Sequence, residues 1–391
     1  MDVNVESYEY ILNKTKYIDH NLLWYKTIYV RISVKNFNNR KLFTNNLMYW
    51  NNTYNNRAMP WKGEKDPYKI WLSEIILQQT RVEQGLEYYN RFVKTYPTIE
   101  LLAAADENAV FKLWEGLGYY SRCKNLIATA RIIAFDNNNV FPINYEAILK
   151  LKGVGPYTAA AIASFAFNLP HAVVDGNVMR VLSRFFGIEV PIDSNDGKKL
   201  MTTLAQNVMD IGDPSSYNQA IMDFGATICK PQLPLCPTCL LQPYCIAYKK
   251  KLVTELPIKQ KKLHKKHRYF YYIIAEYNNK IYVKKRTAKD IWQNLWEFIL
   301  VEKPEKISIE NFIKSDDFVN IFEENNSAIF TTIFYKQQLT HQTIEGTFIY
   351  VKCKMPLNSK LYITVNKADI STLAFPRFIT NFFEKSREFK L

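Results

Sequence analysis

Apolar residues recur three and four positions apart through the middle of the chain. The repeat is clearest in a set of stretches between about residues 45 and 227, which are 67–96, 108–135, 157–167, 177–188 and 196–212. This spacing places apolar side chains on one face of an α-helix. The pattern therefore predicts a mainly helical domain, which we place at residues 41–250.

The pattern changes toward the C-terminus. The runs YFYYIIAEY (269–277), KIYVKKR (280–286) and GTFIYVKCKM (346–355) are rich in aromatic and β-branched residues and are separated by turn signals such as NN and EG. Runs of this kind predict strands. We expect an α+β domain at residues 268–391, joined to the helical domain by a basic linker at 251–267. Residues 1–40 show no clear period, and we expect an N-terminal extension that is disordered in part or lies upstream of the working domain.

Four of the six cysteines fall in one proline-rich segment, at Cys229, Cys236, Cys239 and Cys245. Their spacing is C-x6-C-x2-C-x5-C. In a long chain without a charged-then-apolar leader we expect a reducing compartment, and four close thiols then indicate a metal site. Zinc usually takes two C-x2-C pairs, whereas iron–sulfur clusters accept uneven spacing, so the spacing favours a cluster and leaves zinc open.

The chain is strongly basic. Lys and Arg exceed Asp and Glu by 51 to 37, which gives a formal net charge of +14. This balance fits a partner dense in phosphates, and it is equally what a compositionally biased genome produces. The best candidate for a membrane span, AAAIASFAF, is about half the ~18 residues that a span requires, so we expect a soluble protein.

A Gly-Val-Gly turn at Gly153, Val154 and Gly155 joins two predicted helices, with Pro156 near the start of the second. Proline is favoured at the first helical position. The glycines allow a tight turn that exposes backbone amides beside a helix N-terminus, a geometry that can hold a phosphate oxygen without reading a base. Most such turns are merely turns, and the basic, helical context is what favours a nucleic-acid contact here.

Several motifs together resemble a known family. The hairpin LKGVGPYTA and the cysteine spacing resemble the helix-hairpin-helix and the four-iron, four-sulfur loop of the endonuclease III superfamily of DNA glycosylases. Within that superfamily, the adenine DNA glycosylase family is resembled by RAMPW (57–61), DPYKIWLSEIILQQT (66–80), WEGLGYYSR (114–122), VVDGNVMRV (173–181) and NQAIMDFGATIC (218–229). The resemblance implies base excision repair: hydrolysis of the N-glycosidic bond of adenine mispaired with 8-oxoguanine in double-stranded DNA, by an enzyme that carries one 4Fe–4S cluster.

Two carboxylates are the implied catalytic groups. Glu74 is the implied acid, because apolar neighbours on the predicted helix would raise its pKa, although the residues alone favour an exposed helix glutamate. Asp175 is implied to stabilise the oxocarbenium-like sugar, and Asn177 to order the same site. Without the resemblance, Asp175 would be a helix cap.

The resemblance also assigns residues around the reacting base. Bifunctional relatives carry a lysine where this chain has Tyr157, and a phenol cannot form the imine through which such a lysine cuts the strand. The residues implied to line the adenine pocket are Arg57, Trp61, Leu77 and Gln219. Gln79 and Tyr119 are implied to enter the helix near the mispair, since an extruded base leaves a gap to be filled.

The C-terminal domain resembles the family's Nudix-like module, which recognises 8-oxoguanine, through DIWQNLWEF (290–298) and LAFPRFI (373–379). It lacks the R-E-x-x-E-E box of Nudix hydrolases, so we expect binding without hydrolysis. Thr340 and His341 are the implied contacts, and Leu339 replaces an aromatic residue in that turn. A structural histidine is an equal alternative for His341.

Two other functions remain open from the sequence. One is an endonuclease III-like bifunctional glycosylase-lyase, against which Tyr157 and the C-terminal module argue. The other is a non-enzymatic iron–sulfur DNA-binding or redox protein, against which the pair of Glu74 and Asp175 argues. We expect a monomeric enzyme of the bacterial cytoplasm that associates with the nucleoid through DNA and binds no membrane.

Overall fold

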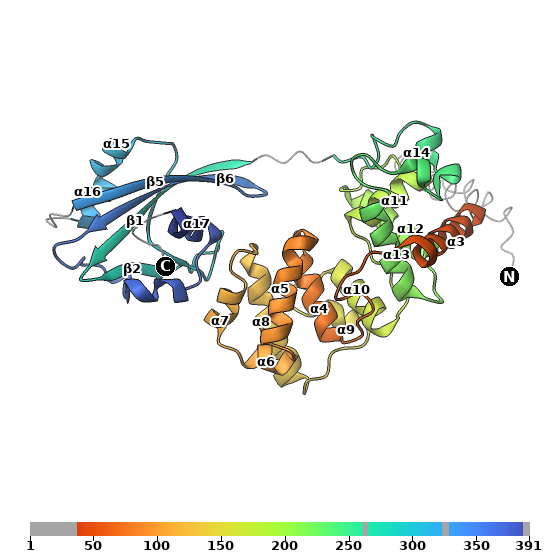
Figure 1. Cartoon of the computed structure of the whole chain (residues 1–391), viewed down its shortest axis with the longest axis horizontal. Helices are drawn as coiled ribbons and strands as arrows, with labels where there is room; N and C mark the ends of the chain where they lie inside the picture. The colour runs from red at the N-terminus through yellow and green to blue at the C-terminus, as the bar shows by residue number, and fades with distance from the viewer. Residues whose placement is uncertain (1–36, 261–264, 323–327, 386–391) are drawn as a thin grey trace, which may run out of the picture. The chain divides into compact units, whose positions relative to one another are not determined.

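The computed structural model describes residues 37–260, 265–322 and 328–385 (Figure 1). The predicted N-terminal extension therefore lies almost wholly outside the described residues. The chain forms two compact units, and each unit combines two segments that are far apart in the sequence. The first unit contains the described residues up to Ala58 together with Asn168–Gln260, and the second contains Met59–Phe167 together with the described residues beyond 260.

The first unit is helical. Its elements are α3 (Phe37–Tyr54), α11 (Gly176–Phe186), α12 (Asn195–Val208), α13 (Pro214–Thr227), α14 (Ile246–Lys249) and the short 3₁₀ turns η2 (Cys236–Thr238) and η3 (Gln242–Tyr244). The apolar faces of α3, α11, α12 and α13 share one core, in which the ring of Phe43 lies 4.9 Å from that of Phe185 and 5.8 Å from that of Phe186, measured between centroids. Helix α11 ends at Phe186, and the next residue, Gly187, has a φ of 64°, the left-handed conformation that glycine adopts readily at helix ends.

The second unit contains the remaining helices of the predicted helical domain. They are α4 (Pro67–Leu77), α5 (Val82–Thr95), α6 (Ile99–Ala104), α7 (Glu107–Leu113), α8 (Tyr120–Arg131), the π-helical turn η1 (Ile132–Asp136), α9 (Tyr145–Leu149) and α10 (Pro156–Phe167). Pro156 opens α10, as its position in the sequence predicts. The apolar stretch 108–135 spans α7, α8 and most of η1, and it is interrupted between α7 and α8 because Gly116 and Gly118 take φ values of 93° and 78° that a helix does not allow.

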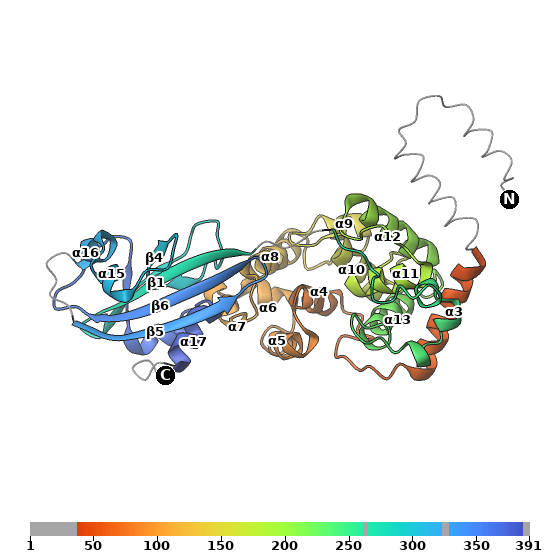
Figure 2. The ribbon, with the colours of Figure 1, turned by 90° about the horizontal axis from the view of Figure 1, so that it is seen from above.

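The second unit also contains a mixed β-sheet. Its strands are β1 (Lys266–Tyr277), β2 (Lys280–Lys285), β3 (Trp296–Glu297), β4 (Ile299–Lys303), β5 (Ala328–Gln338), β6 (Gln342–Lys352) and β7 (Ile363–Asn366). Their order is β3-β2-β1-β6-β5, with β4 paired to β1 and β7 to β2. Strands β1 and β6 are parallel, and Figure 2 shows β1, β6 and β5 running side by side.

Side chains alternate between the two faces of this sheet. Phe270 and Tyr272 of β1 lie in the core cluster that includes residues of α17 (Arg377–Lys385), whereas Tyr271 lies in the cluster with Phe312 of α15 (Ile309–Ile313) and Phe318 of α16 (Asp316–Phe322). A 3₁₀ turn, η4 (Lys367–Thr372), follows β7. In the part of the chain that the structure describes, no helix has the length and apolar character needed to cross a bilayer.

Candidate active site and cluster loop

Glu74 lies in the middle of α4 and is buried, with 4% of its surface exposed. The helix begins at the N-cap Asp66, whose side chain accepts a hydrogen bond from the amide of Tyr68, and Pro67 occupies its first position. Ile70 and Trp71, one turn before Glu74, are buried as well. A solvent-exposed helix glutamate is therefore excluded.

Asp175 is the N-cap of α11, in the first unit. Its Oδ1 accepts a hydrogen bond of 2.7 Å from the amide of Val178, and its Oδ2 accepts one of 2.7 Å from Nδ2 of Asn177. Burial raises the pKa of the Asp175 carboxyl above the ordinary value of 3.8, and these two hydrogen bonds and the charge of Arg180 oppose that rise. The carboxylate of Asp175, which has the predicted catalytic role, is therefore also the cap of α11.

Arg180 is a buried residue whose role the sequence reasoning missed. Its Nη2 donates to Oδ1 of Asn177 and to the carbonyl of Gly225, both at 2.7 Å, and its Nε donates to the carbonyl of Cys229 at 2.8 Å. Arg180 therefore links two residues. One is Asn177, which is hydrogen-bonded to Asp175, and the other is Cys229, the first cysteine of the loop. The place of Arg180 three residues after Asn177, on one helix face, was the available signal.

The four cysteines line one pocket of the first unit together with Arg184. The Nη1 of Arg184 lies 3.5 Å from Sγ of Cys229 as a hydrogen-bond donor, and Sγ of Cys245 donates to the carbonyl of Arg184 at 3.4 Å. Burial raises the pKa of the Cys239 thiol to about 12. A thiolate in such surroundings requires positive charge nearby, which a bound metal supplies. No three His, Cys, Asp or Glu side chains among the described residues are arranged to hold a single metal ion.

The Gly-Val-Gly turn joins α9 to α10. Gly153 has a φ of 77°, and a Cβ atom there would stand 2.8 Å from Cβ of Asn125, so only glycine fits. A Cβ atom at Gly155 would meet open space. Val154 is buried and anchors the turn, while Gly153 remains exposed. Tyr157, in the first turn of α10, is partly exposed.

The predicted adenine-pocket residues of the first unit share one partner. Fully buried Asp223 accepts a hydrogen bond from Nη1 of Arg57 at 2.8 Å and another from Nε2 of Gln219 at 3.1 Å. Asn55 donates to the other carboxylate oxygen of Asp223 at 3.0 Å. Asp223 was not singled out from the sequence, although it lies one helical turn after Gln219. It holds two groups that can present polar atoms to a base edge.

The other two predicted pocket residues belong to the second unit. The ring of Trp61 meets that of Tyr89 edge-on, at a centroid distance of 5.4 Å. Leu77, the last residue of α4, packs so closely on α5 that a Cβ atom at Gly85 would lie 2.7 Å from Leu77 Cδ2. The contacts of Trp61 and Leu77 thus lie within the second unit, and their assignment to an adenine pocket stays a prediction.

The two residues predicted to enter the DNA helix share an unusual backbone. Gln79 and Tyr119 have φ values of 56° and 49°, in the left-handed region that residues other than glycine rarely adopt. Gln79 is exposed, and 39% of the Tyr119 surface is exposed. The Tyr119 hydroxyl is hydrogen-bonded to Oγ1 of Thr340, so the structure brings together two of the residues assigned to the mispair. His341 is exposed, and its carbonyl accepts a hydrogen bond from the amide of Lys266 at 3.0 Å.

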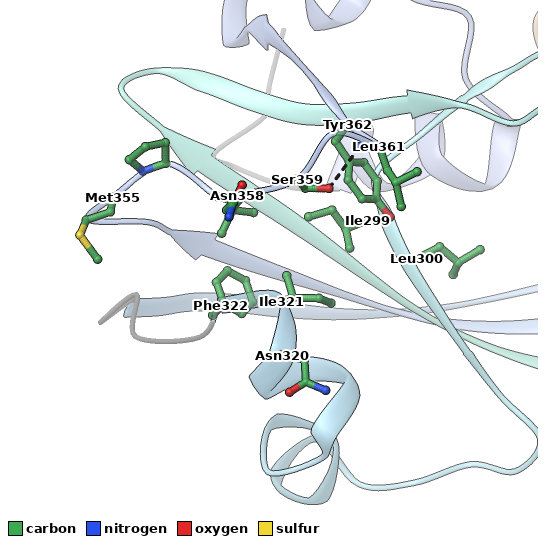
Figure 3. A pocket seen from close by; sticks show the side chains of 12 residues that line it. Ile299, Leu300, Asn320, Ile321, Phe322, Met355, Asn358, Ser359, Leu361 and Tyr362 are labelled. Carbon is green, nitrogen blue, oxygen red and sulfur yellow. Dashed lines mark hydrogen bonds between the residues drawn. The ribbon is translucent and has the colours of Figure 1, made fainter.

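A separate pocket lies in the β-rich part of the second unit (Figure 3). Residues of α16, the start of β4 and the segment 355–362 line it, and none of the predicted site residues is among them. Its polar side chains are those of Asn320, Asn358, Ser359 and Tyr362.

Two family models match the chain. The first, described as HhH-GPD superfamily base excision DNA repair protein, matches residues 72–208, and the second, a NUDIX domain, matches residues 270–385. These matches confirm the predicted fold class, a helical helix-hairpin-helix domain followed by a Nudix-like α+β domain.

Relatives extend the similarity over most of the chain. The adenine DNA glycosylase of Buchnera aphidicola subsp. Baizongia pistaciae is 32% identical over 356 residues, which cover 89% of this chain and 97% of that protein. The adenine DNA glycosylase of Mus musculus is 40% identical over 217 residues, which cover 53% of this chain and 42% of that protein. Among solved structures, a thermostable thymine-DNA glycosylase matches with a TM-score of 0.50 and 33% identity, covering 54% of this chain and 97% of its own. Because the first similarity extends over nearly all of both chains, this chain belongs to the adenine DNA glycosylase family.

Proposed function

We propose that this protein removes adenine mispaired with 8-oxoguanine, or with guanine, from double-stranded DNA by hydrolysing the N-glycosidic bond. The observation that carries the proposal is the burial of Glu74 among apolar residues of α4. The reaction needs a carboxyl group that can deliver a proton to the base in a site shielded from bulk water, and a buried glutamate meets that need.

The reaction assigns one task to each carboxylate. Glu74 donates a proton to a ring nitrogen of the extruded adenine, so that the base can accept the electron pair of the breaking bond to the sugar. Asp175 remains ionised and stabilises the positive charge that develops on the sugar. A water molecule then forms the new bond to the sugar carbon and releases a proton. Asn177 and the amide of Val178 hold Asp175 in place through the hydrogen bonds described above.

The strand should remain intact after base removal. A lyase needs an amine that attacks the sugar and forms an imine, and Tyr157 offers a phenol at the position implied for that amine. Gly153, Val154 and Gly155 are proposed to hold a DNA phosphate through the exposed turn beside the start of α10.

Cys229, Cys236, Cys239 and Cys245 are proposed to hold a 4Fe–4S cluster. Such a cluster binds four thiolates at four different irons, and four sulfurs around one pocket suit it. The cluster would fix the loop, and the hydrolysis needs no electron transfer. Anaerobically purified protein should contain about four irons per chain. Stoichiometric zinc in a fully active, colourless protein would contradict the assignment.

The Nudix-like domain is proposed to recognise 8-oxoguanine through Thr340 and His341 without hydrolysing a nucleotide. Three of its carboxylates are already paired with buried arginines: exposed Asp290 and Glu302 bind Arg268, and buried Glu297 binds Arg286. Carboxylates neutralised in this way are poor ligands for magnesium. A monomer in the bacterial cytoplasm is the state we expect for this function.

One experiment tests the assignment against its alternatives. Duplexes that carry a single defined lesion are incubated with the protein, and strand breaks are measured before and after alkali. Breaks that need alkali, from duplexes with adenine opposite 8-oxoguanine, support the proposal. Breaks without alkali, with covalent trapping by borohydride, would support a lyase, and binding without base loss would support a non-enzymatic DNA-binding protein.

A further inference from the structure

Arg122, on α8, is 9% exposed, and within the part of the chain that the structure describes its guanidinium donates to neutral acceptors. Its Nη1 donates to the carbonyls of Ile75 and Ile76 at 2.8 and 2.9 Å. Its Nη2 donates to Oγ1 of Thr80 at 3.3 Å and to the carbonyl of Gly118 at 3.4 Å. Burial lowers the pKa of the guanidinium to about 10, so the group is still charged at neutral pH.

These contacts fix the end of the helix that carries Glu74. The last four carbonyls of an α-helix have no partner within the helix. Helix α4 ends at Leu77, and Ile75 and Ile76 directly follow Glu74. A cation is also favourable at this end because of the helix dipole. Arg122 therefore caps α4 immediately after the proposed acid.

The same guanidinium supports both left-handed residues. Gln79 precedes Thr80, and Tyr119 follows Gly118, so each left-handed residue is next to an acceptor of Arg122. A left-handed conformation is strained in a residue other than glycine, so both turns need support from their surroundings. The guanidinium carbon also lies 5.5 Å from the centroid of the Tyr119 ring, which adds a cation–π contact.

We propose that Arg122 is a positioning residue that locks the Glu74 end of α4 and the turns at Gln79 and Tyr119 into one arrangement, so that extrusion of the adenine and its protonation occur together. This inference rests on the proposed function and deepens it. A lysine could keep the charge but could not reach four acceptors with the geometry of a planar fork.

The test compares Arg122→Lys and Arg122→Met with Arg131→Lys and Arg131→Met. Arg131 lies on the same helix, is more exposed and is paired with Glu107, so its variants are matched controls. Single-turnover release of adenine is measured from a duplex with adenine opposite 8-oxoguanine and from a duplex in which the adenine is already unpaired in a bulge. Extrusion is followed by the fluorescence of 2-aminopurine placed beside the target adenine.

Both Arg122 variants should lose about 10²-fold in rate on the paired substrate, because extrusion of the adenine and the placement of Glu74 are impaired together. They should lose less on the bulged adenine, which needs no extrusion from a base pair, and they should show no fluorescence rise, while the Arg131 variants behave like the wild type. Normal extrusion in the Arg122 variants, or an equal loss on both substrates, would overturn the inference. If Arg122→Met does not fold, Arg122→Lys decides alone. Failure of the proposed function itself is distinct, because the wild type would then release adenine from neither substrate.

Discussion

At the scale of single residues, the proposed chemistry depends on one buried proton donor. Glu74→Gln keeps the size of the side chain and most of its hydrogen bonds, but it cannot deliver a proton. Base removal should therefore fall by at least the ~10²-fold typical of a lost general acid, while affinity for the mispair persists. Single-turnover kinetics and fluorescence anisotropy measure the two quantities separately.

Glu87→Gln is the matched control for this change, since the Glu87 side chain is 74% exposed. It should leave the rate unchanged. A Glu74→Gln protein that folds, binds DNA and releases adenine at the wild-type rate would remove Glu74 from the mechanism.

The pH dependence tests the second carboxylate. Burial raises the pKa of Asp175, so the carboxylate becomes protonated at a higher pH than an ordinary aspartate. Because the ionised form stabilises the sugar cation, the rate should fall as the pH drops through this raised pKa. Asp175→Asn should be slow at every pH and should lack that acidic limb. An acidic limb of the same shape in both proteins would assign the titration to another group.

At the scale of elements, the Gly-Val-Gly turn gives a prediction with an internal control. Gly153→Ala places a side chain at a left-handed φ and within 2.8 Å of Asn125, so the free energy of unfolding should fall by at least the roughly 1–2 kcal/mol of the backbone term. Gly155→Ala meets no atom within 4 Å and should cost far less. Chemical denaturation measures both proteins. Equal stability in the two variants would contradict the described turn.

Local signals in the sequence predicted the element starts that position the site. Pro156 opens α10 and Asp175 caps α11, because a cap or a fixed φ acts within one turn of its own residue. The interruption between α7 and α8 was not predicted, since a glycine inside an apolar helical pattern does not reveal its φ. The parallel pairing of β1 with β6 was not predicted either, because it joins segments far apart in the chain.

Arg122 and Arg180 lie in motifs that are recognisable in the sequence, but no role could be predicted for either residue. Their main acceptors are backbone carbonyls, at Ile75 and Ile76 for Arg122 and at Cys229 for Arg180. Every residue has a carbonyl, so no residue type marks such a partner. Only the folded chain shows which carbonyls lie at a helix end and need a donor.

At the scale of the whole molecule, the residue at which the helical domain ends decides where the chain can be cut to remove the Nudix-like domain. Residues 251–260 close the first unit: the Leu256 carbonyl accepts a hydrogen bond from Arg184 at 2.9 Å, and the Ile258 carbonyl accepts one from the amide of Ile192 at 3.0 Å. A cut at residue 250 would remove these contacts and uncover Arg184, which also contacts Cys229. The informative truncation therefore ends at Gln260.

A chain ending at Gln260 should still remove adenine, because Glu74, Asp175 and the four cysteines all remain. It should lose much of its preference for 8-oxoguanine over guanine opposite the adenine, since the domain proposed to recognise 8-oxoguanine is gone. Thr340→Ala in the full chain is the matched control: it leaves the domain in place, removes the partner of the Tyr119 hydroxyl and should reproduce part of the loss. Single-turnover rates on the two mispairs give the preference of each protein. An unchanged preference in the truncated chain would show that recognition of the opposite base lies in the helical domain, and the Nudix-like domain would then need another role.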